Sequence, residues 1–333
     1  MPEARSMQPV HVATSQRQGR ATATRPPLPP LPPPVSLLQR LPAAMWEGAS
    51  PWLFAALYYP ALQVLPLYLF ARGPRSETIY RRMAATAAAL ALGGWLPTAQ
   101  RLAARVVDGK APASLAPSLG LRVPGLAAAA ALPLLLTMLL FAGPLLALAL
   151  SRPRSAGSGV GARFSGQSSS LWAQRVTHLP FAVCLRNWVA APLLEEFLFR
   201  ACLLSYLLAA GASPARCIAL SPALFAACHL HHLHDLIRFQ GVPPAAALQQ
   251  VASQFVYTWV FGSLASFYFI RSRHLVAAVL PHAFCNLVGP PALPQRHRRA
   301  VAVAMVAGAA AFFCLLRPLT EPHLFANLHG WVD

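Results

Sequence analysis

The segment Ala191-Pro-Leu-Leu-Glu195-Glu196-Phe-Leu-Phe-Arg200-Ala201 places two adjacent carboxylates and an arginine inside an apolar run that covers residues 188–210. A charged side chain at the centre of a bilayer costs about 2.5–3.5 kcal/mol on insertion scales, so such residues are rare there and usually functional. In a helix, Glu196 and Arg200 stand at i and i+4, where they can form an ion pair. Glu195 then points about 100° away and has no evident partner on its own helix. An unpaired carboxylate in such a place indicates chemistry.

The composition of the chain indicates a membrane protein. Hydrophobic residues make up 56% and charged residues 11% of the 333 residues, and the mean hydropathy is +0.49. A soluble domain has about 25% charged residues. The net charge of +18 raises the question of nucleic-acid binding, but the arginines are scattered between apolar segments. Arginine beside apolar segments is better explained by orientation against the cytosolic leaflet. We therefore expect contact with membrane lipid and no nucleic-acid partner.

The hydropathy pattern predicts an all-α fold, a polytopic transmembrane helical bundle with about eight spans. Proline is tolerated inside such spans when neighbouring helices satisfy the backbone groups that it frees. The two halves of the sequence show no internal repeat, which weakens the hypothesis of a transporter built on internal symmetry. The predicted spans cover residues 51–71, 83–98, 124–150, 188–210, 214–230, 246–270, 274–290 and 299–316.

The same pattern divides the chain into five regions. Residues 1–45 are proline-rich and predict a disordered tail, because proline at that density cannot hold a helix or a sheet. Residues 46–150 contain the N-terminal transmembrane spans, and the Ser/Gly/Arg-rich residues 151–175 form a linker. Residues 176–320 make the predicted catalytic transmembrane core, and residues 321–333 a C-terminal tail.

Polar residues recur in the later spans. The fifth predicted span ends in Phe225-Ala-Ala-Cys-His229-Leu-His231-His232-Leu-His234-Asp235, and the seventh contains His282-Ala-Phe-Cys-Asn286. His282 and Asn286 are at i and i+4, so they share a helix face. Each group alone has a structural explanation, such as an ion-pair clamp, interfacial histidines or a hydrogen bond between helices. Together they supply every group that hydrolysis of an amide requires.

The chemistry of these groups predicts roles for them. A carboxylate in a low-dielectric site holds a proton more tightly, so Glu195 could take a proton from water near neutral pH, and His229 could share it. His282 and Asn286 could donate hydrogen bonds to the oxyanion of the tetrahedral intermediate, at about 3–4 kcal/mol per donor. A serine nucleophile is disfavoured because the sequence lacks G-x-S-x-G.

Zinc hydrolysis is the main chemical alternative. The H-E-x-x-H pattern of many zinc proteases is absent from the sequence. Glu195, His229 and His282 could nevertheless form a three-ligand zinc site with one open position. We favour the metal-free mechanism and expect no cofactor, with zinc kept as the alternative.

Three motifs now give a family resemblance. Glu195-Glu196-x-x-x-Arg200, Phe225-x-x-x-His229 and His282-x-x-x-Asn286, in this order, resemble the CAAX protease and bacteriocin-processing membrane endopeptidases. The flanking sequences are similar to the eukaryotic branch, the type II CAAX prenyl endopeptidases. These flanks are Arg186-Asn187-x-x-x-Ala-Pro, His229-x-His231-His232 and Gln254-Phe-x-Tyr257-Thr258-x-Val-Phe-Gly262. The resemblance covers about residues 185–290.

The resemblance implies an intramembrane endopeptidase of the endoplasmic reticulum, which removes the last three residues of prenylated CAAX proteins such as Ras-like GTPases. It implies that Glu195 and His229 activate the water. His282 and Asn286 would stabilise the oxyanion, and Glu196 and Arg200 would be supporting residues. Three alternatives are a related endopeptidase for unprenylated peptides, a proton-coupled membrane transporter and a structural membrane scaffold.

Overall fold

The computed structural model describes residues 50–69, 75–107, 114–150, 179–289 and 297–327. Within these ranges all regular secondary structure is helical, so the expected all-α class is confirmed for this part of the chain. The predicted N-terminal tail at 1–45 and the predicted linker at 151–175 lie outside the described residues.

The N-terminal helices form two groups. The first group consists of α2 (Pro51–Leu69), α3 (Arg75–Ala89), the π-helical turn η2 (Leu90–Gly94), α4 (Leu96–Val107) and the short α5 (Leu115–Ser118). The second group consists of α6 (Leu126–Leu140) and α7 (Ala142–Ala149), which meet at a bend of 75°.

The helical segment that contains the two glutamates runs without a break from Phe181 to Ala209. Its hydrogen-bond pattern alternates between α-helical and π-helical turns, and π-helical turns are frequently found at functional sites. The six-residue α10 lies between two π-helical stretches and contains both glutamates. The parts are α9 (Phe181–Leu185), η3 (Arg186–Ala190), α10 (Ala191–Glu196), η4 (Phe197–Leu204) and α11 (Ser205–Ala209).

The remaining helices complete the bundle. They are α12 (Pro214–Ala227), the 3₁₀ turn η5 (Cys228–Leu230), α13 (His231–Arg238), α14 (Pro244–Ser272), α15 (Val276–Val288), α16 (Arg298–Leu316), and the 3₁₀ turns η6 (Pro318–Thr320) and η7 (Pro322–Phe325). Helix α12 begins with Pro214, and the Ser213 hydroxyl accepts a hydrogen bond from the Arg216 N–H at 3.4 Å, which caps the helix.

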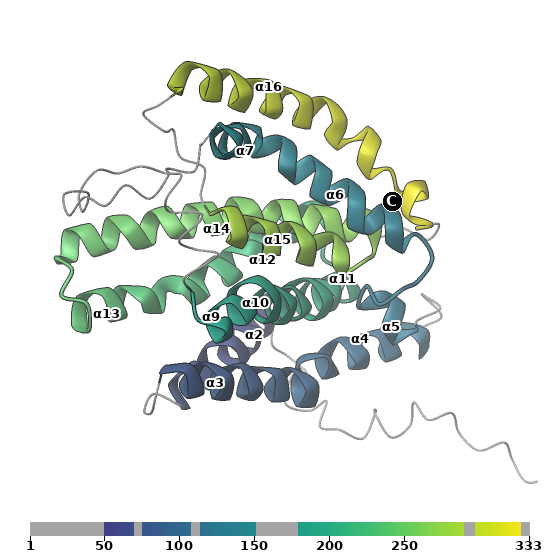
Figure 1. The fold of residues 1–333 in the computed structure, drawn as a ribbon. Helices are drawn as coiled ribbons and strands as arrows, with labels where there is room; N and C mark the ends of the chain where they lie inside the picture. Colours follow the sequence, from purple (N-terminus) through teal and green to yellow (C-terminus); the bar gives the residue numbers. More distant parts are fainter. Residues whose placement is uncertain (1–49, 70–74, 108–113, 151–178, 290–296, 328–333) are drawn as a thin grey trace, which may run out of the picture.

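The helices are arranged in layers (Figure 1). The central layer contains α9 to α12, α14 and α15; α2, α3 and α4 lie on one side of it, and α6, α7 and α16 on the other. The largest apolar core surrounds η4, where Leu198, Leu203 and Leu204 are fully buried. A second core lies between α6, α14, α15 and α16 and includes Leu136 and Phe312. The chain therefore brings helices from both halves of the sequence together around the glutamate segment.

Glycine allows the closest approach between central helices. A Cβ atom at Gly262 of α14 would lie 2.7 Å from the Cβ of Pro222 in α12 and 2.9 Å from Nη2 of Arg200. Real Cβ contacts are not that short, so α14 can pack against α12 and the arginine because residue 262 has no side chain.

The number of membrane spans remains a prediction. Within the described residues, α16 alone is long and apolar enough to cross a membrane, with a mean hydropathy of 2.1 in its most apolar part. Helices α6 and α7 meet the same criterion if they are treated as one broken span. The other predicted spans do not meet this criterion of length and composition as single helices.

Candidate active site

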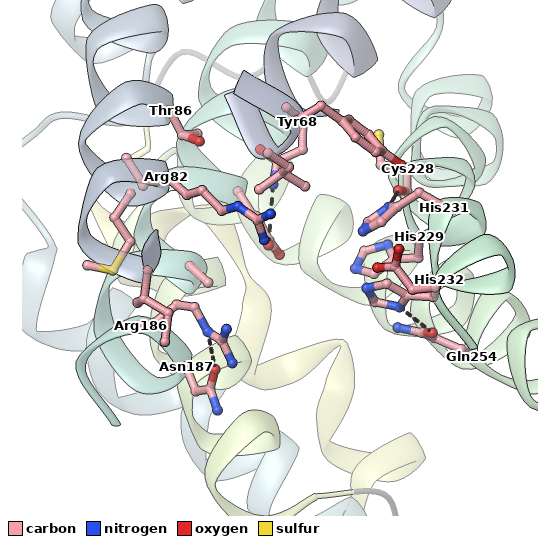
Figure 2. A pocket seen from close by; sticks show the side chains of 18 of the residues that line it. Tyr68, Arg82, Thr86, Arg186, Asn187, Cys228, His229, His231, His232 and Gln254 are labelled. Atoms are coloured by element: carbon pink, nitrogen blue, oxygen red, sulfur yellow. Dashed lines mark hydrogen bonds between the residues drawn. The ribbon is translucent and has the colours of Figure 1, made fainter. Parts of the chain in front are cut away.

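A cavity of about 1010 Å³ opens among α2, α3, η3, α10, η5, α13, α14 and α15. The four predicted catalytic residues all line it: Glu195 from α10, His229 from η5, and His282 and Asn286 from α15. Figure 2 shows three histidines, His229, His231 and His232, on one wall and the arginines Arg82 and Arg186 on the opposite wall. Residues that are far apart in sequence thus line one cavity.

Glu196 and Arg200 form a buried ion pair behind this cavity. Nη1 of Arg200 lies 3.2 Å from Oε1 and 3.1 Å from Oε2 of Glu196, and the two side chains are 1% and 0% exposed. Nη2 of Arg200 donates to the carbonyl oxygen of Gly262 at 3.1 Å, and its guanidinium lies 4.9 Å from the centre of the Phe225 ring. The pair that the i and i+4 spacing predicts is therefore present, and it is satisfied by α14 and α12 as well.

His282 connects the buried pair to the cavity. Its Nδ1 lies 2.8 Å from Oε1 of Glu196, which fixes the ring because a carboxylate can only accept a hydrogen bond. The other ring nitrogen, Nε2, lies 3.8 Å from Oε2 of Glu195. The His282 ring therefore lies between the two glutamates, with Nδ1 toward the buried Glu196 and Nε2 toward Glu195, which lines the cavity.

Glu195 has weaker contacts than its neighbour. Nε2 of Gln63 in α2 donates to Oε1 of Glu195 at 3.4 Å, and the carboxylate side chain is 15% exposed. Glu196, in contrast, is fully enclosed and has two close partners. Of the two adjacent carboxylates, Glu195 is the one that can receive a water molecule or a substrate.

His229 has its ring orientation set by the backbone. Its Nδ1 lies 3.1 Å from the carbonyl oxygen of Phe225, one helical turn earlier. A carbonyl oxygen accepts and does not donate, so Nδ1 carries the proton, and in the neutral ring Nε2 has the lone pair. His229 can therefore accept a proton from, or hold, a water molecule in the cavity.

Asn286 lies at the rim of the cavity and is exposed. Its Nδ2 donates to the carbonyl oxygen of Asn187 at 2.9 Å. An amide nitrogen has two N–H groups, so one donor remains after this bond. This contact joins α15 to η3 and keeps the amide beside the cavity.

The neighbouring histidines also contribute to the cavity wall. Nδ1 of His232 donates to Oε1 of Gln254 at 3.0 Å, and the rings of His231 and His232 are 4.3 Å apart between centroids. His231, His232 and His234 all line the cavity. These histidines, which follow the predicted span 214–230, therefore line the cavity as part of α13.

Gln63 and Arg82 are among the polar residues of the cavity that the sequence analysis missed. Gln63 is a single polar residue in the apolar span 51–71, and that interruption is a signal that could have found it. Arg82 directly precedes the predicted span 83–98 and reads as one of a cluster of basic residues, yet it lies within α3 and lines the cavity. Both come from the N-terminal helices, for which the motifs gave no site.

Metal ligation has no ready geometry in the described part of the chain. Among those residues, no three histidine, cysteine, aspartate or glutamate side chains are grouped so that they could hold a metal ion. The three ligands of the zinc alternative, Glu195, His229 and His282, all line the cavity without forming such a group.

Known proteins share the sequence around this cavity. Residues 177–288 match the family model of the type II CAAX prenyl endopeptidase Rce1-like proteins. CAAX prenyl protease 2 of Homo sapiens is 40% identical over 225 residues, which is 65% of this chain and 64% of that protein. The resemblance that the three motifs predict is therefore confirmed.

Two further relatives give the same result. CAAX prenyl protease 2 of Rattus norvegicus is 36% identical over 222 residues, 65% of this chain and 62% of that protein. The Arabidopsis thaliana protein of the same name is 35% identical over 198 residues, 58% of this chain and 64% of that protein. The chain thus matches a little less than two thirds of the length of these relatives. No solved structure matches the chain.

Proposed function

We propose that this protein is an endopeptidase of the endoplasmic reticulum membrane that removes the C-terminal tripeptide from prenylated CAAX proteins, such as Ras-like GTPases. The observation that carries the proposal is that Glu195, His229, His282 and Asn286 line one cavity. The similarity to proteins named CAAX prenyl protease 2 supports the choice of substrate.

Glu195 and His229 activate the attacking water in this mechanism. Glu195 has an oxygen on the cavity and only weak contacts, at 3.4 Å and 3.8 Å, so it can accept a proton from water. Nε2 of His229 accepts a second hydrogen bond from the same water and orients it. The resulting hydroxide attacks the scissile carbonyl, and the proton then passes to the leaving amine.

His282 and Asn286 stabilise the oxyanion that forms. A protonated His282 keeps its bond to Glu196 through Nδ1 and has an Nε2–H for the oxyanion. The second N–H of Asn286 donates from the rim, and each such donor contributes about 3–4 kcal/mol.

The substrate requires the site to open to lipid. A prenyl chain partitions into a bilayer at about 0.8 kcal/mol per buried CH₂ group, so the enzyme must meet the substrate in the membrane. We propose that the helical bundle crosses the membrane about eight times, as the hydropathy pattern predicts, and that the cavity receives the peptide end of the substrate. The mechanism uses no cofactor.

Cleavage of a farnesylated CAAX peptide by the full-length protein in membranes tests the proposal. Wild type should release the C-terminal tripeptide, and Glu195→Ala and His229→Ala should each reduce turnover about 10²- to 10⁴-fold. If either variant kept a turnover near that of wild type, the mechanism would be wrong.

Parallel reactions separate the alternatives. Faster cleavage of the same peptide without the farnesyl group would identify an endopeptidase for unprenylated substrates. Proton flux in vesicles without peptide cleavage would identify a transporter. A chelator such as 1,10-phenanthroline should leave the turnover unchanged, and a loss that added zinc restores would establish the zinc mechanism instead.

A further inference from the structure

Arg82 has a position that the proposed chemistry does not explain. It lies in α3, lines the cavity and extends from the wall that faces the histidines (Figure 2). Its Nε is buried, and it has no hydrogen-bond partner among the described residues. The adjacent Arg81 is different, because it is exposed and forms an ion pair with Glu77 on the outer face of the same helix.

Among the described residues, neither acid that lines the cavity forms an ion pair with Arg82. Glu195 is contacted by Gln63 and His282. Asp235 is contacted by His234, whose Nδ1 lies 3.8 Å from Oδ1 of Asp235 in an exposed pair. Arg186, the second arginine of this wall, lines the same cavity and donates through Nε to the side chain of Asn187 at 2.8 Å. Both arginines thus line the cavity, and Arg82 adds a buried donor without a partner among the described residues, so this wall is a suitable site for an anion.

The proposed substrate has an anion at a fixed distance from the bond that is cut. A tripeptide that follows the scissile carbonyl ends in a free carboxylate, and three extended residues span at most about 10–11 Å. A cavity of about 1010 Å³ is large enough for such a segment beside Glu195. Guanidinium is the side chain best suited to a carboxylate, since both can form two parallel hydrogen bonds.

We propose that Arg82, assisted by Arg186, binds the C-terminal carboxylate of the substrate and so measures where the chain is cut. This inference rests on the proposed function. Arg82 acts here as a substrate-binding residue, and it makes cleavage specific for a peptide bond three residues from a free chain end. It also gives the N-terminal helix α3, which lies outside the region matched by the family model, a direct role in specificity.

Two farnesylated peptides of the same sequence test this, one with a free C-terminal carboxylate and one with a C-terminal carboxamide. Wild type should favour the acid over the amide by about 10- to 100-fold in kcat/KM, as expected for a hydrogen bond between charged groups. Arg82→Gln should bring this ratio close to one by raising KM for the acid. Arg82→Lys should keep part of the preference, and Arg81→Gln should retain the wild-type ratio.

Each outcome has a definite meaning. Equal cleavage of acid and amide by wild type overturns the inference without any variant and leaves the proposed function in place. An equal loss on both peptides in Arg82→Gln and Arg82→Lys also overturns it, because a structural role would affect both. Failure of wild type to cleave either peptide instead refutes the proposed function, and the inference with it.

Discussion

The polar groups around the cavity and those around the C-terminal turns use their hydrogen bonds differently. The second set, which we call the C-terminal clasp, consists of Arg122, Arg271, Glu321 and Asn327. Nε of Arg271 donates to the Thr320 carbonyl at 2.8 Å, Nδ2 of Asn327 donates to the Arg271 carbonyl at 3.0 Å, and Nη2 of Arg122 donates to the Ala326 carbonyl at 2.7 Å. Donors of the clasp thus bind backbone carbonyls of neighbouring elements.

The cavity groups bind one another as well as backbone carbonyls, and some of them keep atoms directed at the cavity. Arg200, Glu196 and His282 form a chain of contacts that ends at Glu195, whose own contacts are long. The clasp holds η6 and η7 against α14, whereas the cavity cluster holds reactive groups in place and leaves them accessible. Side-chain atoms left unfilled on a cavity therefore mark a chemical role, whether or not the same side chain also bonds to backbone.

The buried arginine gives the largest expected effect on stability. Arg200→Met leaves Glu196 buried without its cation, which should cost about 3–5 kcal/mol in free energy of unfolding. Arg81→Met is a matched control, because Glu77 and Arg81 form an i and i+4 pair with both side chains 50% exposed, and it should cost about 0.3–0.5 kcal/mol. Denaturation of the purified variants in detergent measures both values. Similar losses of stability in the two variants would show that the buried Glu196–Arg200 pair stabilises the protein no more than the exposed Glu77–Arg81 pair.

Substitution of one asparagine in each region tests which region takes part in catalysis. Asn286→Ala should reduce kcat about 10²- to 10³-fold, because it removes an oxyanion donor, and should change stability little since Asn286 is exposed. Asn327→Ala removes the same kind of side chain from the clasp and should leave kcat unchanged. Peptide cleavage by both variants provides the test. Equal turnover in the two variants would contradict the distinction.

A glycine under the ion pair tests how tightly the cavity cluster is packed. Gly262→Ala introduces a Cβ within 2.9 Å of the Arg200 guanidinium and 2.7 Å of Pro222, and this overpacking should cost about 1–3 kcal/mol of stability. Ser263→Ala, at the next position of α14, should change stability by less than about 0.5 kcal/mol. The unfolding midpoints of the two variants measure these effects. A Gly262→Ala variant with the stability of wild type would mean that α14 and α12 can move apart without cost.

The clasp ion pair gives the smallest expected effect. Nη2 of Arg271 lies 3.1 Å from Oε2 of Glu321, and the glutamate side chain is 39% exposed. Glu321→Gln should cost less than about 1 kcal/mol, because the glutamate is partly exposed and glutamine keeps an oxygen beside Arg271, and it should not change kcat. A large loss of peptide cleavage in this variant would give the clasp a part in the chemistry.

Local spacing predicted much of the site. The i and i+4 positions of Glu196 and Arg200 specified their ion pair, because the two residues are neighbours on any helix. The helical segments around Glu195, His229 and His282 followed from hydropathy, and the structure places all three residues on one cavity. These features depend on short stretches of sequence or on motifs that repeat helical spacing.

Long-range packing supplied what the sequence could not. The contact between Gln63 and Glu195 joins residues 132 positions apart, and no periodicity in either segment specifies it. The place of Arg82 likewise depends on how α3 packs beside α9 and η3. The π-helical turns around α10 also have no simple sequence signal.

The most direct test of the account is to remove the charge of Glu195 while keeping its shape. Turnover of a farnesylated CAAX peptide and the free energy of unfolding should both be measured for Glu195→Gln and wild type. We predict a loss of turnover of about 10³-fold with no loss of stability, because Glu195 has only long contacts and faces the cavity. Wild-type turnover in the variant, or a fall in stability large enough to explain the lost activity, would contradict the account.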